Sequence, residues 1–216
     1  HIRPGEKIGL VGRSGAGKTS LINSIHHAFD SNDTVKQIWI NSWEYSLLST
    51  PEEALLKIVN RIIDELLESD TDVGRKEAIK EGAGKIFRGA LRVGAQVALG
   101  SEAAKVANEL LDSSAQSIAA LRQQLTDLVK DIANRPSNPY KKVVVYVDDL
   151  DRIEPRNAVA ILELLKNIFS VPRCVFILAI DYQVVVKGLE HKFGKQTPEN
   201  EWEFRAFFDK IIQLPF

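Results

Sequence analysis

A glycine-rich stretch near the start of the chain constrains its fold more than any other feature. Residues 6–12 form a short apolar run that ends in glycine, and GRSGAGKTS occupies residues 12–20. Apolar residues at helical spacing follow in LINSIHHAF, residues 21–29. Strand, glycine-rich turn and helix form the context in which the pattern G-x-x-x-x-G-K-[ST] binds phosphate. We therefore expect a strand and a helix joined by a phosphate-binding turn.

The chemistry of this turn depends on its backbone and on two side chains. Gly15 and Gly17 allow backbone N–H groups to point inward around phosphate oxygens, and the helix adds the positive end of its dipole. Lys18 is predicted to reach the β- and γ-phosphates, and the Thr19 hydroxyl to bind Mg²⁺. The alternative is a glycine-rich turn with an exposed lysine. The predicted nucleotide-binding residues are Gly12, Arg13, Ser14, Gly15, Ala16, Gly17, Lys18, Thr19 and Ser20.

Three aspartates follow the valine-rich run of residues 143–147. The run reads VVVYV, and Asp148, Asp149 and Asp151 come after it. An apolar run this short indicates a strand buried on both faces, and a carboxylate at its end requires a positive partner. We expect Asp148 to hold the Mg²⁺ of a nucleotide through its coordinated water. Asp149 is predicted to orient or deprotonate the attacking water, with a helix cap or a supporting metal contact as the alternative.

Two further aspartates are harder to interpret. Asp151 is given a structural role, either in a local ion pair with Arg152 or as a cap of the helix that follows. Asp181 ends the apolar run of residues 174–181, and the carboxyl ends of parallel strands face the ligand crevice. Asp181 is therefore a candidate sensor of the γ-phosphate or of the attacking water. A plain helix N-cap is the alternative.

Strands and helices alternate along most of the chain. Strands are also expected at residues 36–43 and 210–216, and helices from Pro51, from about 155 to 169, and after Asp181. This alternation predicts an α/β fold with a parallel sheet covered by helices on both faces. Residues 1–216 are expected to form one nucleotide-binding domain.

Residues 70–135 interrupt the alternation and are interpreted as a helical insertion. They contain six glycines between Gly74 and Gly100, and six basic residues face two acids in the first half. Apolar residues at helical spacing follow from Leu111 to Ile132. The basic half is a candidate contact for an anionic surface, either membrane or nucleic acid. A solvated helix face is the preferred interpretation.

Composition excludes several classes of protein. The net charge is −1, so no overall field recruits nucleic acid, and a nucleic-acid partner stays an open question. The single cysteine, Cys174, cannot form an internal disulfide, and a reducing, cytoplasmic location is expected. No apolar run reaches the roughly 18 residues that span a bilayer. Because the chain has no methionine and starts almost directly on a strand, we interpret it as a piece of a longer protein.

Four segments together resemble the KAP family of P-loop NTPases: GLVGRSGAGKTSLI, INSWEY, VVVYVDDLDRIEP and FFDKIIQLPF. The D-D-L-D-R run and the K-I-I-Q-L-P-F ending carry the resemblance more specifically than the glycine-rich turn does. The resemblance implies a five-stranded sheet of order 5-1-4-3-2, with the lysine, threonine and two adjacent aspartates in the roles given above. Asn41 and Trp43 match a family motif after the second strand, without a defined chemical role.

The resemblance also implies an activity. It implies Mg-dependent ATP binding and hydrolysis by a module that drives or switches a larger protein, in bacteria often one linked to defence against phage or plasmids. The absence of an N-K-x-D motif favours ATP over GTP. Self-association, or contact with other domains of the full-length protein, is expected. The alternative is a nucleotide-binding scaffold that assembles without turnover; a kinase is a third interpretation, for which no acceptor motif is visible.

Arg205 is a candidate catalytic residue of a different kind. It precedes the last expected strand, a region that faces the γ-phosphate of the neighbouring subunit in oligomeric ATPases of this general core. An arginine there would neutralise charge that develops in the transition state. Arg152 and Arg173 are rival candidates. The alternative is a surface residue that pairs with Glu201 or Asp209, each four residues away.

Overall fold

The computed structural model describes residues 7–46, 51–68, 73–82, 118–131, 133–134, 140–168 and 170–215. Its centre is a five-stranded sheet of order β2-β3-β4-β1-β5. All four strand pairs are parallel. This order is the predicted 5-1-4-3-2 counted from the other edge, so the predicted fold class is confirmed. The strands are β1 (Lys7–Val11), β2 (Val35–Asn41), β3 (Lys142–Asp148), β4 (Cys174–Ile180) and β5 (Leu214–Pro215).

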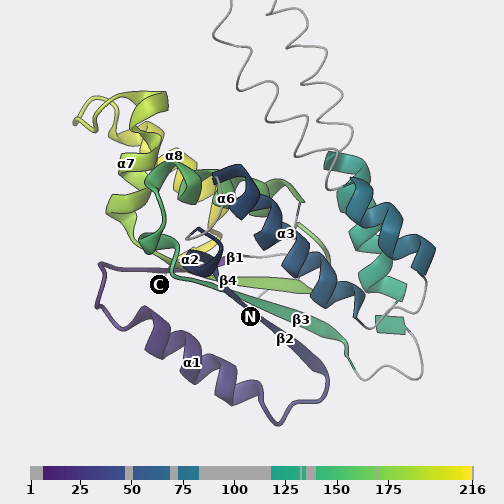
Figure 1. Ribbon diagram of the computed structural model, residues 1–216. Helices are drawn as coiled ribbons and strands as arrows, with labels where there is room; N and C mark the ends of the chain where they lie inside the picture. The colour runs from purple at the N-terminus through teal and green to yellow at the C-terminus, as the bar shows by residue number, and fades with distance from the viewer. Residues whose placement is uncertain are drawn as a thin grey trace, which may run out of the picture.

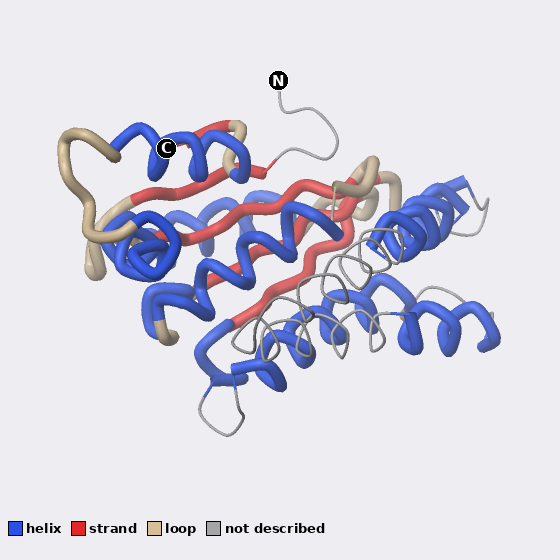
Figure 2. Tube along the Cα trace, turned by 90° about the horizontal axis from the view of Figure 1, so that it is seen from above, coloured by secondary structure: helices blue, strands red, loops and turns tan. Residues whose placement is uncertain are grey.

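Helices cover both faces of the sheet. Figure 1 shows α1 on one face, whereas α3, α6, α7 and α8 lie over the other. Figure 2, which views the molecule from above, shows helices of that second face in front of the strands. The helices are α1 (Lys18–Phe29), α2 (Ser42–Ser46), α3 (Pro51–Leu67), α6 (Pro155–Ile168), α7 (Tyr182–Phe193) and α8 (Glu201–Ile211), with a 3-10 turn η1 at Leu150–Arg152. No helix among the described residues is long and apolar enough to cross a membrane.

The inner strand β3, which lies between β2 and β4, divides its side chains between two apolar clusters. Side chains alternate along a strand, so neighbours point to opposite faces. Val143, Val145 and Val147 join the larger cluster under α3, α6, α7 and α8. Val144 and Tyr146 join the smaller cluster, which contains Ile22 of α1. Burial on both faces explains why β3 is an uninterrupted apolar run in the sequence.

Two predicted strand ends differ from the structure. The strand expected at 36–43 ends at Asn41, and α2 begins at Ser42. The strand expected at 210–216 is reduced to Leu214–Pro215, because Lys210 and Ile211 belong to α8. Buried Phe204 and Ile211 repeat at helical spacing, and this period outweighs the β-favouring run that follows. The proline fits because β5 is an edge strand.

Part of the expected insertion packs into the main core. Residues 73–82 and 118–131 are helical, while residues 83–117 lie outside the described part of the chain, so the interpretation of 70–135 as an insertion stays a prediction. Ile79, Leu121 and Leu125 are buried in the same cluster as Ile58 and Ile62 of α3. The described helices of the insertion therefore share a core with the sheet layer.

Leu125→Ala should destabilise the domain as a whole. The side chain is 0% exposed, and truncating a buried leucine typically costs about 2–5 kcal/mol. We expect one thermal unfolding transition that shifts to lower temperature when followed by circular dichroism. Arg122→Ala, at an exposed neighbouring position, is the matched control and should shift little. A separate early transition, with the main one unchanged, would instead make the insertion an independent unit.

Lys7 should make stability depend on alkaline pH. The side chain is 2% exposed, and its Nζ lies 3.3 Å from the Ser170 hydroxyl. Burial, together with the charge of Lys166, lowers the Lys7 pKa to about 8. The cost of burying the charge is full below pH 8 and disappears as pH rises toward the unfolded value near 10.5. Lys7→Met should thus gain stability over the unmodified chain at pH 7, and denaturant titrations should show that gain shrinking toward pH 10.5; a constant difference would contradict the burial argument.

Candidate functional site

The glycine-rich turn and the aspartates predicted for the site lie at the carboxyl edge of the sheet. Asn41, which ends β2, lies opposite Asp148, which ends β3. Val11, which ends β1, lies opposite Ile180 of β4, and the Gly12 N–H donates to the Ile180 carbonyl at 3.0 Å. Because all these strands point the same way, the segments that follow them gather at one edge.

The glycine-rich turn has the backbone conformation that its sequence predicts. Gly15 and Gly17 have φ values of 80° and 86°, in the left-handed region that glycine adopts without strain. Gly17 is the N-cap of α1, and no side chain caps this helix start. A Cβ on Gly12 would lie 3.1 Å from the Ala16 Cβ, a close contact that would require the turn to shift by a few tenths of an ångström. The uncapped N–H groups and the helix dipole favour an anion at this position.

Lys18 folds back over the turn. Its Nζ donates to the carbonyls of Gly12 at 3.0 Å and Arg13 at 3.1 Å. The same atom lies 3.5 Å from an Asp151 oxygen, and both side chains are 10% exposed. Asp151 therefore faces the phosphate turn and does not form the local pair with Arg152 that the sequence suggested. Thr19 and Ser20 are exposed at the start of α1.

Asp148 and Asp149 differ in their surroundings. Asp148 is 3% exposed, and its Oδ1 accepts the Asp149 N–H at 2.9 Å. Asp149 has φ 59°, a left-handed conformation that is uncommon outside glycine and recurs at functional sites. Its Oδ1 lies 2.7 Å from Nε of Arg152. Burial, and then the negative charge of Asp148, raise the pKa of Asp149.

Asp181 connects β4, the phosphate turn and α7. One carboxylate oxygen accepts the Gln183 N–H at 2.9 Å, which makes Asp181 the N-cap of α7. The other oxygen accepts the Ser14 N–H at 3.1 Å. The N-cap alternative is thus observed, with an added contact to the phosphate turn. A role in sensing phosphate or water stays a prediction.

Two polar groups beside Asp148 were not assigned a role from the sequence. The Asn41 Oδ1 and the Ser42 Oγ are buried, and neither has a hydrogen-bond partner among the described residues. The Asn41 Nδ2 donates to Glu44 at 2.9 Å. Buried polar atoms without a hydrogen-bond partner are costly and uncommon. The Asn41 and Ser42 oxygens are therefore candidate contacts for a ligand bound at this edge. The change from an apolar strand to Asn-Ser was the sequence feature that could have identified these two residues as part of the site.

The three arginine candidates lie in different places. Arg205 is exposed on α8, and its guanidinium lies 2.8 Å from Glu201, the pair that the alternative interpretation gave. Arg152 lies in η1, beside the acidic residues. Arg173 precedes the first residue of β4, at the amino edge of the sheet, which is opposite to the carboxyl edge, so only its alternative as a contact for a partner stays a prediction.

Comparisons with known proteins agree with this geometry. The chain is similar to a protein of Escherichia coli (strain K12) called "Phage T7 exclusion protein", with 26% identity over 225 residues. That alignment covers 97% of this chain and 29% of the relative, so the chain spans less than a third of the relative's length. The KAP family P-loop domain matches residues 1–216. The resemblance is confirmed: the chain belongs to the KAP family of P-loop NTPases.

Proposed function

We propose that this domain binds Mg·ATP at the carboxyl edge of the sheet and hydrolyses it. One observation carries the proposal: Lys18, at the uncapped start of α1, lies 3.5 Å from Asp151, which follows the buried Asp148 at the end of β3. N–H groups and an amine suit phosphate, while carboxylate and hydroxyl oxygens suit Mg²⁺. The residues present therefore fit a magnesium nucleotide. Mg²⁺, when bound, would neutralise charge on the phosphates.

Each residue has a separate task in this proposal. The N–H groups of the glycine-rich turn bind phosphate oxygens, and Lys18 exchanges Asp151 for the β- and γ-phosphates. Thr19 and Asp148 hold the ion, the latter through a coordinated water. Asp149 orients or deprotonates the attacking water, and its raised pKa accords with a group that accepts a proton. ATP is preferred over GTP because no N-K-x-D motif occurs in the sequence.

The wider role rests on the relative. That protein is named for the exclusion of a phage, and its length is more than three times that of the aligned part. We infer that the ATPase switches or drives a larger protein, with a role in excluding phage. A cytoplasmic setting accords with the single buried cysteine, Cys174.

A nucleotide-binding scaffold without turnover is the second candidate. The observation that favours it is the ion pair of Asp149 with Arg152, at 2.7 Å. A carboxylate held in this way is less free to activate water. The two candidates make different predictions for Asp149.

Lys18→Ala and Asp149→Asn should separate binding from turnover. Loss of the Lys18 amine removes a positive charge from the phosphates, so Mg·ATP should bind at least about tenfold more weakly, a loss of about 1.4 kcal/mol. Asp149→Asn should bind Mg·ATP with near-normal affinity because Asp148 remains, while turnover falls by about 10²-fold or more. Calorimetric titration measures the first quantity and phosphate release the second.

Exposed Lys57→Ala in α3 is the control for both measurements. Equal loss of binding in the Lys18 and Asp149 variants would give Asp149 a ligand or structural role. Unchanged turnover in Asp149→Asn would remove it from the mechanism. Absent turnover in the unmodified chain, with binding intact, would favour the scaffold.

Arg205 is tested as a residue delivered to a neighbouring subunit. If it completes a neighbour's site, activity per chain rises with protein concentration, and Arg205→Ala mixed with Lys18→Ala regains turnover. Glu201→Ala removes the local ion pair but keeps the arginine, so it should retain activity. Equal effects of the Arg205 and Glu201 variants, without recovery on mixing, would leave Arg205 with its local surface pair alone.

A further inference from the structure

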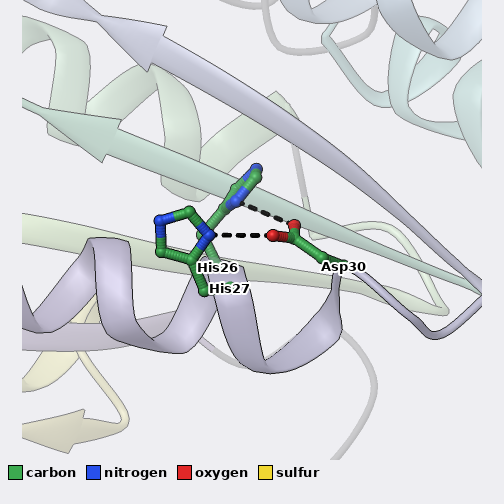
Figure 3. Close-up of side chains that lie close together, drawn as sticks. All are labelled: His26, His27 and Asp30. Atoms are coloured by element: carbon green, nitrogen blue, oxygen red, sulfur yellow. Dashed lines mark hydrogen bonds and ion pairs between the residues drawn. The ribbon is translucent and has the colours of Figure 1, made fainter.

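The far end of α1 carries a cluster that the nucleotide site does not use. His26 and His27 lie in the last turn of the helix, and Asp30 is its C-cap. Nδ1 of His26 lies 3.3 Å from Oδ1 of Asp30, and Nδ1 of His27 lies 2.8 Å from Oδ2. Figure 3 shows both imidazoles turned toward this one carboxylate.

Neighbouring strands hold two of the three side chains in place. Gln37 of β2 donates to the Asp30 Oδ1 at 3.3 Å and accepts the Tyr146 hydroxyl at 2.6 Å. The His26 ring packs against Trp39 and Tyr146, with centroid distances of 5.7 Å and 5.4 Å. A ligand set oriented by outside hydrogen bonds and packing needs less ordering when it binds an ion.

The position of Asp30 calls for a cation. Its backbone is helical, with φ −58° and ψ −31°, and its N–H donates to the His27 carbonyl. A carboxylate here adds negative charge to the negative end of the helix dipole, where positive groups are favoured. A bound cation would offset both the carboxylate and the helix end.

We propose that His26, His27 and Asp30 bind a divalent transition metal ion of the zinc type. One ligand atom from each residue lies within 4.8 Å of the other two. Zn²⁺ binds nitrogen and oxygen at about 2.0–2.2 Å, so neighbouring ligand atoms in a tetrahedral site are about 3.3 Å apart. Binding would therefore require the three side chains to rotate until their ligand atoms reach that spacing.

The chemistry of the ligands separates this ion from the magnesium of the nucleotide. Imidazole nitrogen suits zinc, copper and nickel, whereas Mg²⁺ prefers oxygen ligands. Three protein ligands leave a fourth position for water. Because α1 begins at Lys18, the ion would anchor the far end of the helix that starts at the phosphate turn. The proposal does not depend on the proposed ATPase activity.

A simpler account needs no metal. Each imidazole can donate its Nδ1–H to Asp30, which closes the helix end by hydrogen bonds alone. In that account no ion binds, because the nitrogens that face the carboxylate carry protons. The two accounts therefore differ in whether Zn²⁺ binds and in which residues its binding requires.

The test titrates Zn²⁺ alone into the metal-free 216-residue chain, without nucleotide, by calorimetry. We expect one ion per chain, bound at least about tenfold more weakly by His27→Ala and by Asp30→Asn, since even residues that only orient metal ligands contribute this much. The His27 side chain is 75% exposed, so its removal should leave the fold intact. Zn²⁺ should also raise the melting temperature of the unmodified chain and not that of the variants.

Two controls address the remaining histidines. His191→Ala removes an imidazole whose Nδ1 faces the Gly188 carbonyl, and His1→Ala removes the imidazole of the first residue. Both should bind Zn²⁺ as the unmodified chain does, and Mg²⁺ should not compete. The proposal is overturned if Zn²⁺ fails to bind at 100 µM, a concentration about a hundredfold above a dissociation constant of about 1 µM. Loss of binding in a control, or retention in both cluster variants, also overturns it.

Discussion

The parallel pairing of β3 with β2 and β4 is the constraint on which the candidate site depends. It sets Asp148 opposite Asn41 and leaves the residues after β1, β3 and β4 at one edge. A slip of one residue would exchange the two faces of β3, moving Tyr146 into the cluster that holds Val145 and Val147. The two apolar clusters therefore fix the register, and the register fixes the position of the carboxylate.

The contact between Lys18 and Asp151 is the feature of the site that phosphate would change. The lysine is held by two backbone carbonyls and one carboxylate while both side chains are mostly buried. A nucleotide phosphate offers the same amine more negative charge and several acceptor oxygens. In the proposed function, phosphate binding thus includes a change of partner, which frees Asp151 beside the acidic residues that end β3.

Local sequence patterns predicted much of the fold and of the candidate site. The features that they did not predict have physical causes. The glycine turn and the end of β3 were readable because each chemical group follows an apolar run in sequence. The sheet order came from the family resemblance, since periodicity does not encode strand order. The partner of Asp151 could not be read, because sheet pairing brings it to a lysine distant in sequence. The boundary of β5 was misplaced because the last turn of α8 and the strand share the apolar run IIQLPF.

The most direct test of this account is a crystal structure of the domain with Mg²⁺ and a non-hydrolysable ATP analogue. The account expects the phosphates at the N–H groups of residues 15–19 and the metal between Thr19 and Asp148. It also expects the Lys18 Nζ to leave Asp151 for the phosphate oxygens. Phosphates bound away from the start of α1, or a lysine still paired with Asp151 beside bound nucleotide, would contradict it.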